Sequence, residues 1–227
     1  MLITASMLYN LVQCPHRASM DLYGDPKMRD SISPFVQLLW EKGCDFEEEV
    51  IRGLEVPFTN LRAYSPEERE RITLEAMGRG DQLIYGGRIA TDDLLGEPDL
   101  LRKCRSGYVA GDIKSGAGLE GETDEADGKP KKQYAVQLSL YTDILERMGY
   151  SGGRTPFIWD IHGKEVEYDL DALHGKRNPV ALWQVYCDTL TQARAIAAGN
   201  LSTLPASAGI CKLCHWRTVC VRETEQS

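Results

Sequence analysis

Two short runs near the middle of the chain restrict its fold more than any other feature. Asp99 opens the run 99–104, and Asp112 follows the apolar stretch 107–110. These runs are expected to pair as neighbouring strands of a hairpin, which brings both carboxylates to the point where the strands meet. Lys114 follows Asp112 by two positions, and because side chains on a strand repeat with period two, it is expected on the same face.

Two converging carboxylates and a lysine indicate a metal-dependent site for phosphodiester cleavage. Carboxylate oxygens are hard ligands that suit Mg²⁺ or Mn²⁺, so Asp99 and Asp112 are the expected metal ligands. An ammonium group beside a bound metal orients attacking water and offsets charge on the phosphate, which is the role expected of Lys114. Asp-x-Lys alone is common on solvated strand edges, but a turn at 96–98 directly before Asp99 favours a site.

Seven cysteines in 227 residues include a compact block near the C-terminus. Cys211, Cys214 and Cys220 form a C-x2-C-x5-C pattern, and Cys14 is the remote fourth thiolate. The chain is long enough for a core and no signal peptide is expected, so a metal site is favoured over a disulfide framework or packing cysteines. Four thiolates suit zinc, with His215 as a spare ligand, and a 4Fe-4S cluster equally; the spacing leaves both open. The other three cysteines are expected to be small buried side chains: Cys44, Cys104 and Cys187.

Five motifs occur in a fixed order along the chain: Ser6-x2-Tyr9-x4-Cys14-Pro15-His16-Arg17, Gly96-x2-Asp99, Asp112-x-Lys114, Gln137-x3-Tyr141 and the terminal three-cysteine block. Together they make the chain resemble RecB-like PD-(D/E)XK nucleases that carry an iron-sulfur cluster. That group includes the fourth CRISPR-associated protein, the nuclease domain of the AddB helicase subunit and RecB-like nucleases fused to RNase H domains. The resemblance implies a restriction-endonuclease-like core, DNA cleavage with Mg²⁺ or Mn²⁺, and a 4Fe-4S cluster that joins the chain ends. It therefore favours iron-sulfur over zinc.

The resemblance also directs attention to the first core helix, where such nucleases commonly have a metal-binding histidine just before a glutamate. In the corresponding helix, expected at 35–54, Phe46 stands where that histidine would be and Glu47 follows it. Helical spacing places Glu47 at the edge of the apolar stripe, so it is the expected metal-binding acid in preference to Glu48 or Glu49. The missing histidine leaves weak activity or an altered metal preference open.

Gln137 and Tyr141 lie one turn apart in a helix expected at 133–148. Both fall within its apolar stripe, and an amide on an inward face needs hydrogen-bond partners. Lys114 or a DNA phosphate is expected to supply them; the alternative is a core tyrosine with a glutamine at the helix border. The resemblance assigns the pair to supporting the active site and contacting substrate.

The whole chain, 1–227, is expected to form one α/β domain with a mixed central sheet flanked by helices. Its length suits one such unit, and it contains no internal repeat and no transmembrane run. Residues 1–20 and 205–222 are expected to form the cluster region, and 116–129 a surface loop beside the site. Helices are predicted at 6–22, 35–54, 66–77, 133–148 and 179–198, and Asn178-Pro179 is the expected start of the last one. Strands are predicted at 82–90, 99–104 and 108–114. A hairpin is predicted over 155–170, with its turn at His162-Gly163-Lys164.

The net charge of −8 argues against a broad, nonspecific nucleic-acid binder, because neutralising phosphates is the main source of such affinity. It does not argue against a nuclease, since catalytic acids and an acidic loop carry much of that charge. Six cations are candidates for a local groove: Arg17, Arg102, Lys103, Arg105, Lys131 and Lys132.

The sequence therefore predicts a cytoplasmic Mg²⁺- or Mn²⁺-dependent deoxyribonuclease, an exonuclease acting on single-stranded DNA ends. Asp99, Asp112 and the Ile113 carbonyl, with Glu47, are expected to hold the metal, and Lys114 to position water. The predicted role is CRISPR prespacer processing with an integrase, or DNA repair with a helicase, and no membrane association is expected. The alternative is a catalytically weak iron-sulfur module that binds DNA or is structural.

Overall fold

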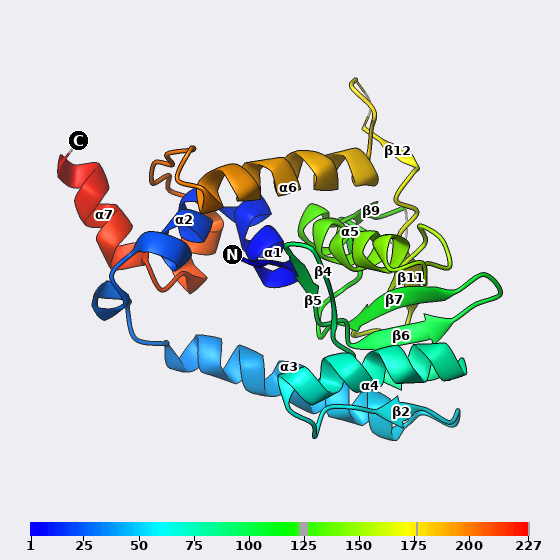
Figure 1. Ribbon diagram of the computed structural model, residues 1–227. Coiled ribbons are helices and arrows are strands. Elements are labelled where there is room, and N and C mark those ends of the chain that lie inside the picture. Colours follow the sequence, from blue (N-terminus) through cyan, green and yellow to red (C-terminus); the bar gives the residue numbers. More distant parts are fainter. Residues whose placement is uncertain (123–126, 176, 227) are drawn as a thin grey trace.

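A computed structural model describes residues 1–122, 127–175 and 177–226, and a six-stranded mixed sheet lies at its centre (Figure 1). Its strands are β2 (Thr59–Asn60), β3 (Leu83–Tyr85), β6 (Leu100–Lys103), β7 (Tyr108–Ile113), β10 (Phe157–Trp159) and β11 (Glu165–Glu167). The order across the sheet is β11-β10-β7-β6-β3-β2. Strands β10 and β7 run parallel, as do β2 and β3, and the remaining neighbours are antiparallel.

Alternate side chains of the central strands enter two different cores. Leu100 and Val109 belong to one core, and their chain neighbours Leu101 and Ala110 belong to the other. A strand with apolar side chains on both faces must be covered on both, and helices do this here. Four helices pack against the core on the Leu101 side: α1 (Ala5–Gln13), α4 (Pro66–Arg79), α5 (Lys132–Arg147) and α6 (Leu182–Ala197). Helix α3 (Pro34–Arg52) packs against the core on the Leu100 side. The predicted restriction-endonuclease-like α/β fold is confirmed.

The helix predicted at 6–22 is two helices, because the chain breaks at Cys14. Cys14 is extended (φ −161°, ψ 107°) and precedes Pro15, the first residue of α2 (Pro15–Tyr23). A residue before proline is disfavoured in the helical region, and proline has no N–H to continue the ladder. The break leaves Cys14 at the junction between two helices.

The strand predicted at 82–90 is also divided. Gly86 has a positive φ of 70° and ends β3, after which β4 (Ile89–Thr91) joins a different sheet. That sheet has the order β1-β5-β4. Its other members are β1 (Ile3–Thr4) and β5 (Leu94–Gly96). The turn therefore places Pro98 and Asp99 where the chain passes from this small sheet back into the central one.

The long C-terminal helix begins later than predicted. Val180 and Ala181 form β13, which pairs with β12 (Leu173–His174), so α6 starts at Leu182 without a side-chain cap. The predicted cap at 178–179 is wrong because these residues lead into a strand. The predicted hairpin of β10 and β11 is present. The segment 116–129, predicted as a loop, instead carries a short strand, β8 (Leu119–Glu120), which pairs with β9 (Lys129–Pro130) at its far end. Residues 123–126, between these strands, lie outside the described part.

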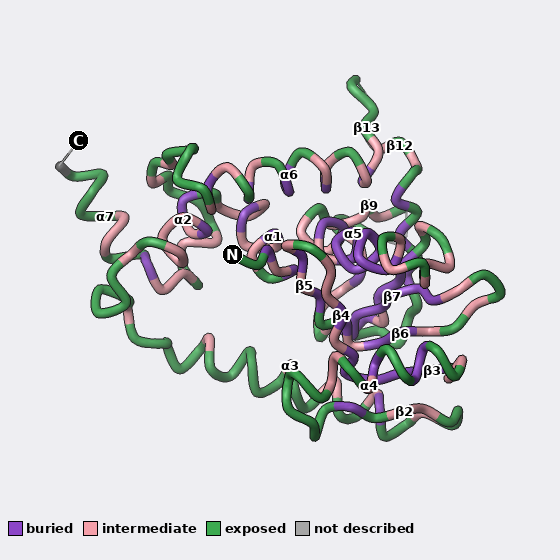
Figure 2. Tube along the Cα trace, in the orientation of Figure 1, coloured by how far each residue is buried: buried purple, intermediate pink, exposed green. Residues whose placement is uncertain are grey.

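Helix α3 has a packed half and an exposed half (Figure 2). Ile51 is buried against the sheet, whereas Phe35, Leu39 and Trp40 are 59%, 43% and 58% exposed. The predicted apolar stripe therefore meets the core only at its C-terminal end. The exposed half leads toward the region that holds both α2 and the C-terminal helix α7 (Arg217–Gln226), far from the sheet (Figure 1).

Two short 3₁₀ helices complete the described elements: η1 (Pro26–Met28) and η2 (Gly209–Leu213). Among the described residues, no helix combines the length and the apolar character needed to cross a bilayer.

Candidate active site

The hairpin of β6 and β7 brings Asp99 and Asp112 together. Leu100 pairs with Gly111 across the ladder, so the two acids occupy the next facing positions. The Asp99 N–H donates to Asp112 Oδ1 over 3.3 Å, and the Ile113 N–H donates to Asp99 Oδ2 over 2.9 Å. Each carboxylate is thus held by a backbone group of the opposite strand, which fixes both at the same end of the hairpin.

Lys114 lies on the same face as Asp112. Its Nζ is 2.8 Å from Asp112 Oδ2. Its N–H donates to the Trp159 carbonyl, which continues the pairing with β10 beyond the end of β7. Asp112 is 1% exposed, so this ion pair lies in a low-dielectric environment where its attraction is strong.

The two aspartates resist being ionised together. Burial, reinforced by the nearby charge of Asp112, raises the pKa of Asp99 to about 7. Burial alone would lower the pKa of Lys114, but Asp112 and Asp99 outweigh it and hold that pKa above its ordinary value. A pair of buried carboxylates with one ammonium is still short of positive charge, and a divalent cation is the natural complement.

Glu47 reaches the site through an arginine that the sequence did not single out. Arg62 Nη2 contacts Glu47 Oε1 and also lies 2.9 Å from Asp99 Oδ1. The Tyr85 hydroxyl donates to Glu47 Oε1 over 2.9 Å, and the Arg62 guanidinium lies 5.2 Å from the Tyr85 ring centroid. Burial, and then the hydrogen bond to Glu47, raise the pKa of Tyr85 to about 12. Glu47 is therefore next to the aspartates but separated from them by a guanidinium.

Gln137 and Tyr141 form a supporting pair behind the acids. Gln137 Nε2 donates to the Tyr141 hydroxyl over 3.0 Å, and that hydroxyl donates to the Glu97 carbonyl over 3.4 Å. Tyr141 is 2% exposed, and its burial, with Asp112 and Asp99 nearby, raises its pKa. Its ring packs against Gly96, where an added Cβ would come within 2.6 Å. The Gln137 amide thus has Tyr141 as partner, and the pair holds the turn that carries Asp99.

Tyr134 lies beside Lys114 and stacks on Tyr9. Tyr9 and Tyr134 have ring centroids 6.2 Å apart and planes 25° from parallel. Lys114 Nζ is 5.7 Å and Lys131 Nζ 5.1 Å from the Tyr134 centroid. Tyr9 belongs to the N-terminal motif, but a stack between residues 125 positions apart leaves no local signal in the sequence.

The oxygen ligands offered by the hairpin fit a hard divalent cation. Asp99 and Asp112 supply carboxylates, and the Ile113 carbonyl follows directly in the chain. Within the part of the chain that the structure describes, no three His, Cys, Asp or Glu side chains converge as a ready single-ion site. Glu47 is not gathered with the two aspartates because Arg62 stands between them.

The four cysteines at the two ends of the chain line one cavity of about 240 Å³. They are Cys14, Cys211, Cys214 and Cys220. Two of the sulfurs accept backbone hydrogen bonds, from the Ala208 N–H to Cys211 over 3.4 Å and from the Trp216 N–H to Cys214 over 3.5 Å. Burial, then the neighbouring sulfurs and Glu223, raise the pKa of Cys220 to about 11.

Within the described residues, these thiols are not gathered as a ready site for a metal ion. A multi-atom cluster carries its thiolates around its outside, and N–H donors to the sulfurs are among the features that tune iron-sulfur centres. Of the other cysteines, Cys104 and Cys187 pack half-buried against the two cores. The prediction for Cys44 is wrong, because it lies on the exposed side of α3.

The fold and the site define a class of protein, one with a nuclease-like α/β sheet and with two acids and a lysine at one hairpin. The family model of the PD-(D/E)XK nuclease superfamily matches residues 12–221. The chain therefore belongs to the PD-(D/E)XK nuclease superfamily. No curated protein sequence matches it.

Proposed function

We propose that this protein is a metal-dependent deoxyribonuclease, an exonuclease acting on single-stranded DNA ends. The observation that carries the proposal is the arrangement of Asp99, Asp112 and Lys114, held at one end of the β6–β7 hairpin within a superfamily of nucleases. Asp99, Asp112 and the Ile113 carbonyl would hold Mg²⁺ or Mn²⁺. The metal, when bound, supplies charge that polarises the phosphate and acidifies water.

The chain's own residues account for the remaining tasks. Lys114 keeps its proton because two acids face it, so it donates to the attacking water or to a phosphate oxygen. Asp112 orients that ammonium, and the Gln137–Tyr141 pair fixes the turn before Asp99. Glu47 would become a further ligand when Arg62 moves aside.

We further propose that Cys14, Cys211, Cys214 and Cys220 hold a 4Fe-4S cluster that joins residues 1–20 to 205–222 within one domain. The shared cavity and the two N–H donors to sulfur support this. The resemblance to RecB-like nucleases suggests a cytoplasmic role in CRISPR prespacer processing or DNA repair, with an integrase or a helicase as partner.

Two observations favour the alternative of a catalytically weak module. Arg62 already provides a cation between Glu47 and Asp99, and Phe46 stands where related nucleases have a histidine ligand. A well-folded protein with its cysteine-bound group intact but without cleavage in Mg²⁺ or Mn²⁺ would select this alternative.

Cleavage of end-labelled single- and double-stranded DNA, in Mg²⁺ and in Mn²⁺, tests the main proposal. Asp112→Asn is expected to abolish cleavage, and Lys114→Ala to slow it by roughly two to four orders of magnitude while Mn²⁺ still binds. Asp92→Asn is the matched control, because Asp92 pairs with Arg147 on the surface and has a φ of 52°, which Asn tolerates. Near wild-type cleavage by Asp112→Asn would refute the site.

A further inference from the structure

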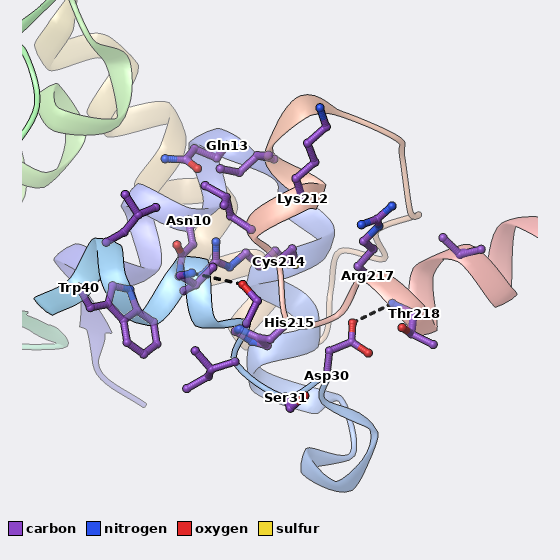
Figure 3. Close-up of a pocket in the computed structure, with 18 of the residues that line it drawn as sticks. Asn10, Gln13, Asp30, Ser31, Trp40, Lys212, Cys214, His215, Arg217 and Thr218 are labelled. Carbon is purple, nitrogen blue, oxygen red and sulfur yellow. Dashed lines mark hydrogen bonds between the residues drawn. The ribbon is translucent and has the colours of Figure 1, made fainter. Parts of the chain in front are cut away.

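A second cavity, of about 810 Å³, lies between the two ends of the chain and the exposed half of α3 (Figure 3). Its walls come from α1, from the segment that leads into α3, and from the cysteine block and α7. Figure 3 shows Trp40, Lys212 and Arg217 placed around it. The cavity adjoins the cysteine cavity and shares six lining residues with it: Arg17, Ile210, Lys212, Cys214, Arg217 and Val221. Tyr9, Trp40 and Arg222 line this cavity and not the cysteine cavity.

The charge of this cavity is opposite to that of the whole protein. The chain has a net charge of −8, yet the cavity is lined by four cations and a single carboxylate, Asp30. Asp30 accepts a hydrogen bond from the Thr218 N–H over 3.0 Å. The cations are Arg17, Lys212, Arg217 and Arg222. A local reversal of charge of this kind indicates an anionic ligand.

Several polar groups in the cavity lack partners. Lys212 and Arg222 are exposed and have no ion-pair partner among the described residues. In the same described part, Gln13 Oε1 and Arg17 Nε are buried atoms without a hydrogen bond, and the nearest acid, Asp21, is 3.9 Å from Arg17. Buried polar groups are normally satisfied, so these are free to receive a ligand.

Aromatic rings accompany the cations. Trp40 lines the cavity and is 58% exposed, and the exposed Leu39 lies beside it. Contiguous exposed apolar side chains mark interaction sites. Tyr9 lines it as well, and its stack on Tyr134 leads to Lys114, whose Nζ is 5.7 Å from the Tyr134 centroid. The cavity is therefore connected to the hairpin site through two stacked rings.

We propose that this cavity, the Trp40 cavity, binds single-stranded DNA and directs its end past Tyr9 toward Lys114. Cations that track a backbone, combined with exposed aromatic faces, are the features of sequence-tolerant single-strand binding. A duplex hides the faces of its bases, so the exposed Trp40 ring selects unpaired DNA. The inference deepens the proposed nuclease function and rests on it for the destination of the strand.

The test measures binding separately from cleavage. In the Asp112→Asn background, fluorescence anisotropy of a labelled oligo-dT and of a matched duplex is followed over a salt series. The single strand is expected to bind more tightly than the duplex. Trp40→Ala should weaken single-strand binding about 5- to 150-fold, the scale of losing one stacked base, with the salt dependence unchanged.

The charge variant should give a different signature. Arg217→Gln with Arg222→Gln is expected to lower the slope of log K against log salt by about 1.4, or about 0.7 for each phosphate that is no longer neutralised. The matched controls are Phe35→Ala, an exposed ring on the same helix outside the cavity, and Arg52→Gln with Arg71→Gln, two exposed cations elsewhere. Both should bind as the parent does.

Equal affinity for duplex and single strand, or equal losses in the cavity and control variants, would overturn the inference. If the wild-type protein cleaves DNA but the cavity variants bind normally, only the cavity assignment fails. If the cavity variants lose binding but no protein with Asp112 intact cleaves DNA, the binding site stands and the nuclease proposal fails.

Discussion

A single guanidinium separates Glu47 from the two aspartates of the hairpin. Arg62 contacts Glu47 and lies 2.9 Å from Asp99, so it occupies the side of the site from which a third carboxylate would reach a metal. Burial opposes its charge, yet Glu47 and Asp99 raise the pKa of Arg62, which remains a cation. A cation held beside Asp99 repels a divalent metal bound to the same carboxylate.

Removing that charge should therefore strengthen metal binding. Arg62→Gln is expected to tighten Mn²⁺ binding by about tenfold, since the repulsion between a cation and a divalent ion a few ångströms apart is on the order of 1 to 2 kcal/mol even at high dielectric. Calorimetric titration with Mn²⁺ measures this, with Arg71→Gln as the control for an exposed arginine on α4. Weaker Mn²⁺ binding in Arg62→Gln would show that the guanidinium holds Glu47 and Asp99 in place for the metal.

Residues on one strand were accessible to prediction, and residues on separate loops were not. Period-two spacing placed Lys114 beside Asp112 because both lie in one continuous extended segment. Arg62 gave no such signal, because it meets Asp99 from a loop 37 positions away. Tyr141, one helical turn along, accepts a hydrogen bond from the Gln137 amide. The expected contact of that amide with Lys114 or a DNA phosphate stays a prediction.

Among the elements, the β10–β11 hairpin shows how one acid fixes a turn. Asp160 is 1% exposed and accepts hydrogen bonds from the N–H groups of Gly118, His162 and Lys164 over 2.9 to 3.0 Å. Burial opposes ionisation, but these backbone donors outweigh it and lower the pKa of Asp160. The carboxylate therefore stabilises the fold in its charged form.

Stability should consequently depend on pH through this group. A lowered pKa in the folded protein contributes stability that is present above the unfolded value of about 3.9 and is lost as pH falls through the folded value. Asp160→Asn is expected to cost roughly 1 to 3 kcal/mol of unfolding free energy at pH 7, and the difference from wild type should shrink below pH 4. Urea unfolding across that range measures it, and exposed Asp45→Asn should behave as wild type. A difference independent of pH would rule out the charged carboxylate as the cause.

The bounds of helices and strands were predicted well where neighbouring residues decide them. They were predicted poorly where pairing with a distant strand decides them. The hairpin turn at 162–164 and the helix α4, capped by Ser65 and Glu68, follow from nearby residues. The late start of α6 does not follow from nearby residues, because Val180 and Ala181 form a strand that pairs with β12. The break at Cys14 was visible as a proline in the sequence, but the apolar pattern on both sides continued through it.

At the scale of the whole molecule, the two ends of the chain build a region that neither could form alone. Cys14 and the terminal cysteines line one cavity, and His215 Nε2 and Trp216 Nε1 lie 2.7 and 2.8 Å from Asp21 Oδ1. The family resemblance, together with the remote fourth cysteine, predicted that the two chain ends lie together. The Trp40 cavity was not predictable, because its cations come from positions 17 and 212–222 and become neighbours only when the ends are joined.

A cofactor that bridges the ends should make global stability depend on Cys14. Cys211 follows Cys14 by 197 positions, and closing a loop of that length restricts the unfolded chain by about 4 to 5 kcal/mol on the scale of a long-loop crosslink. Protein purified without oxygen is expected to be brown and to contain about four irons per chain. Cys14→Ser should lose the colour and unfold at lower urea, whereas Cys44→Ser, on the exposed side of α3, should keep both the iron and the stability. If the protein is colourless, contains one zinc per chain and loses that zinc in Cys14→Ser, the cavity holds zinc and not an iron-sulfur cluster. If Cys14→Ser and Cys44→Ser behave alike, Cys14 binds no cofactor.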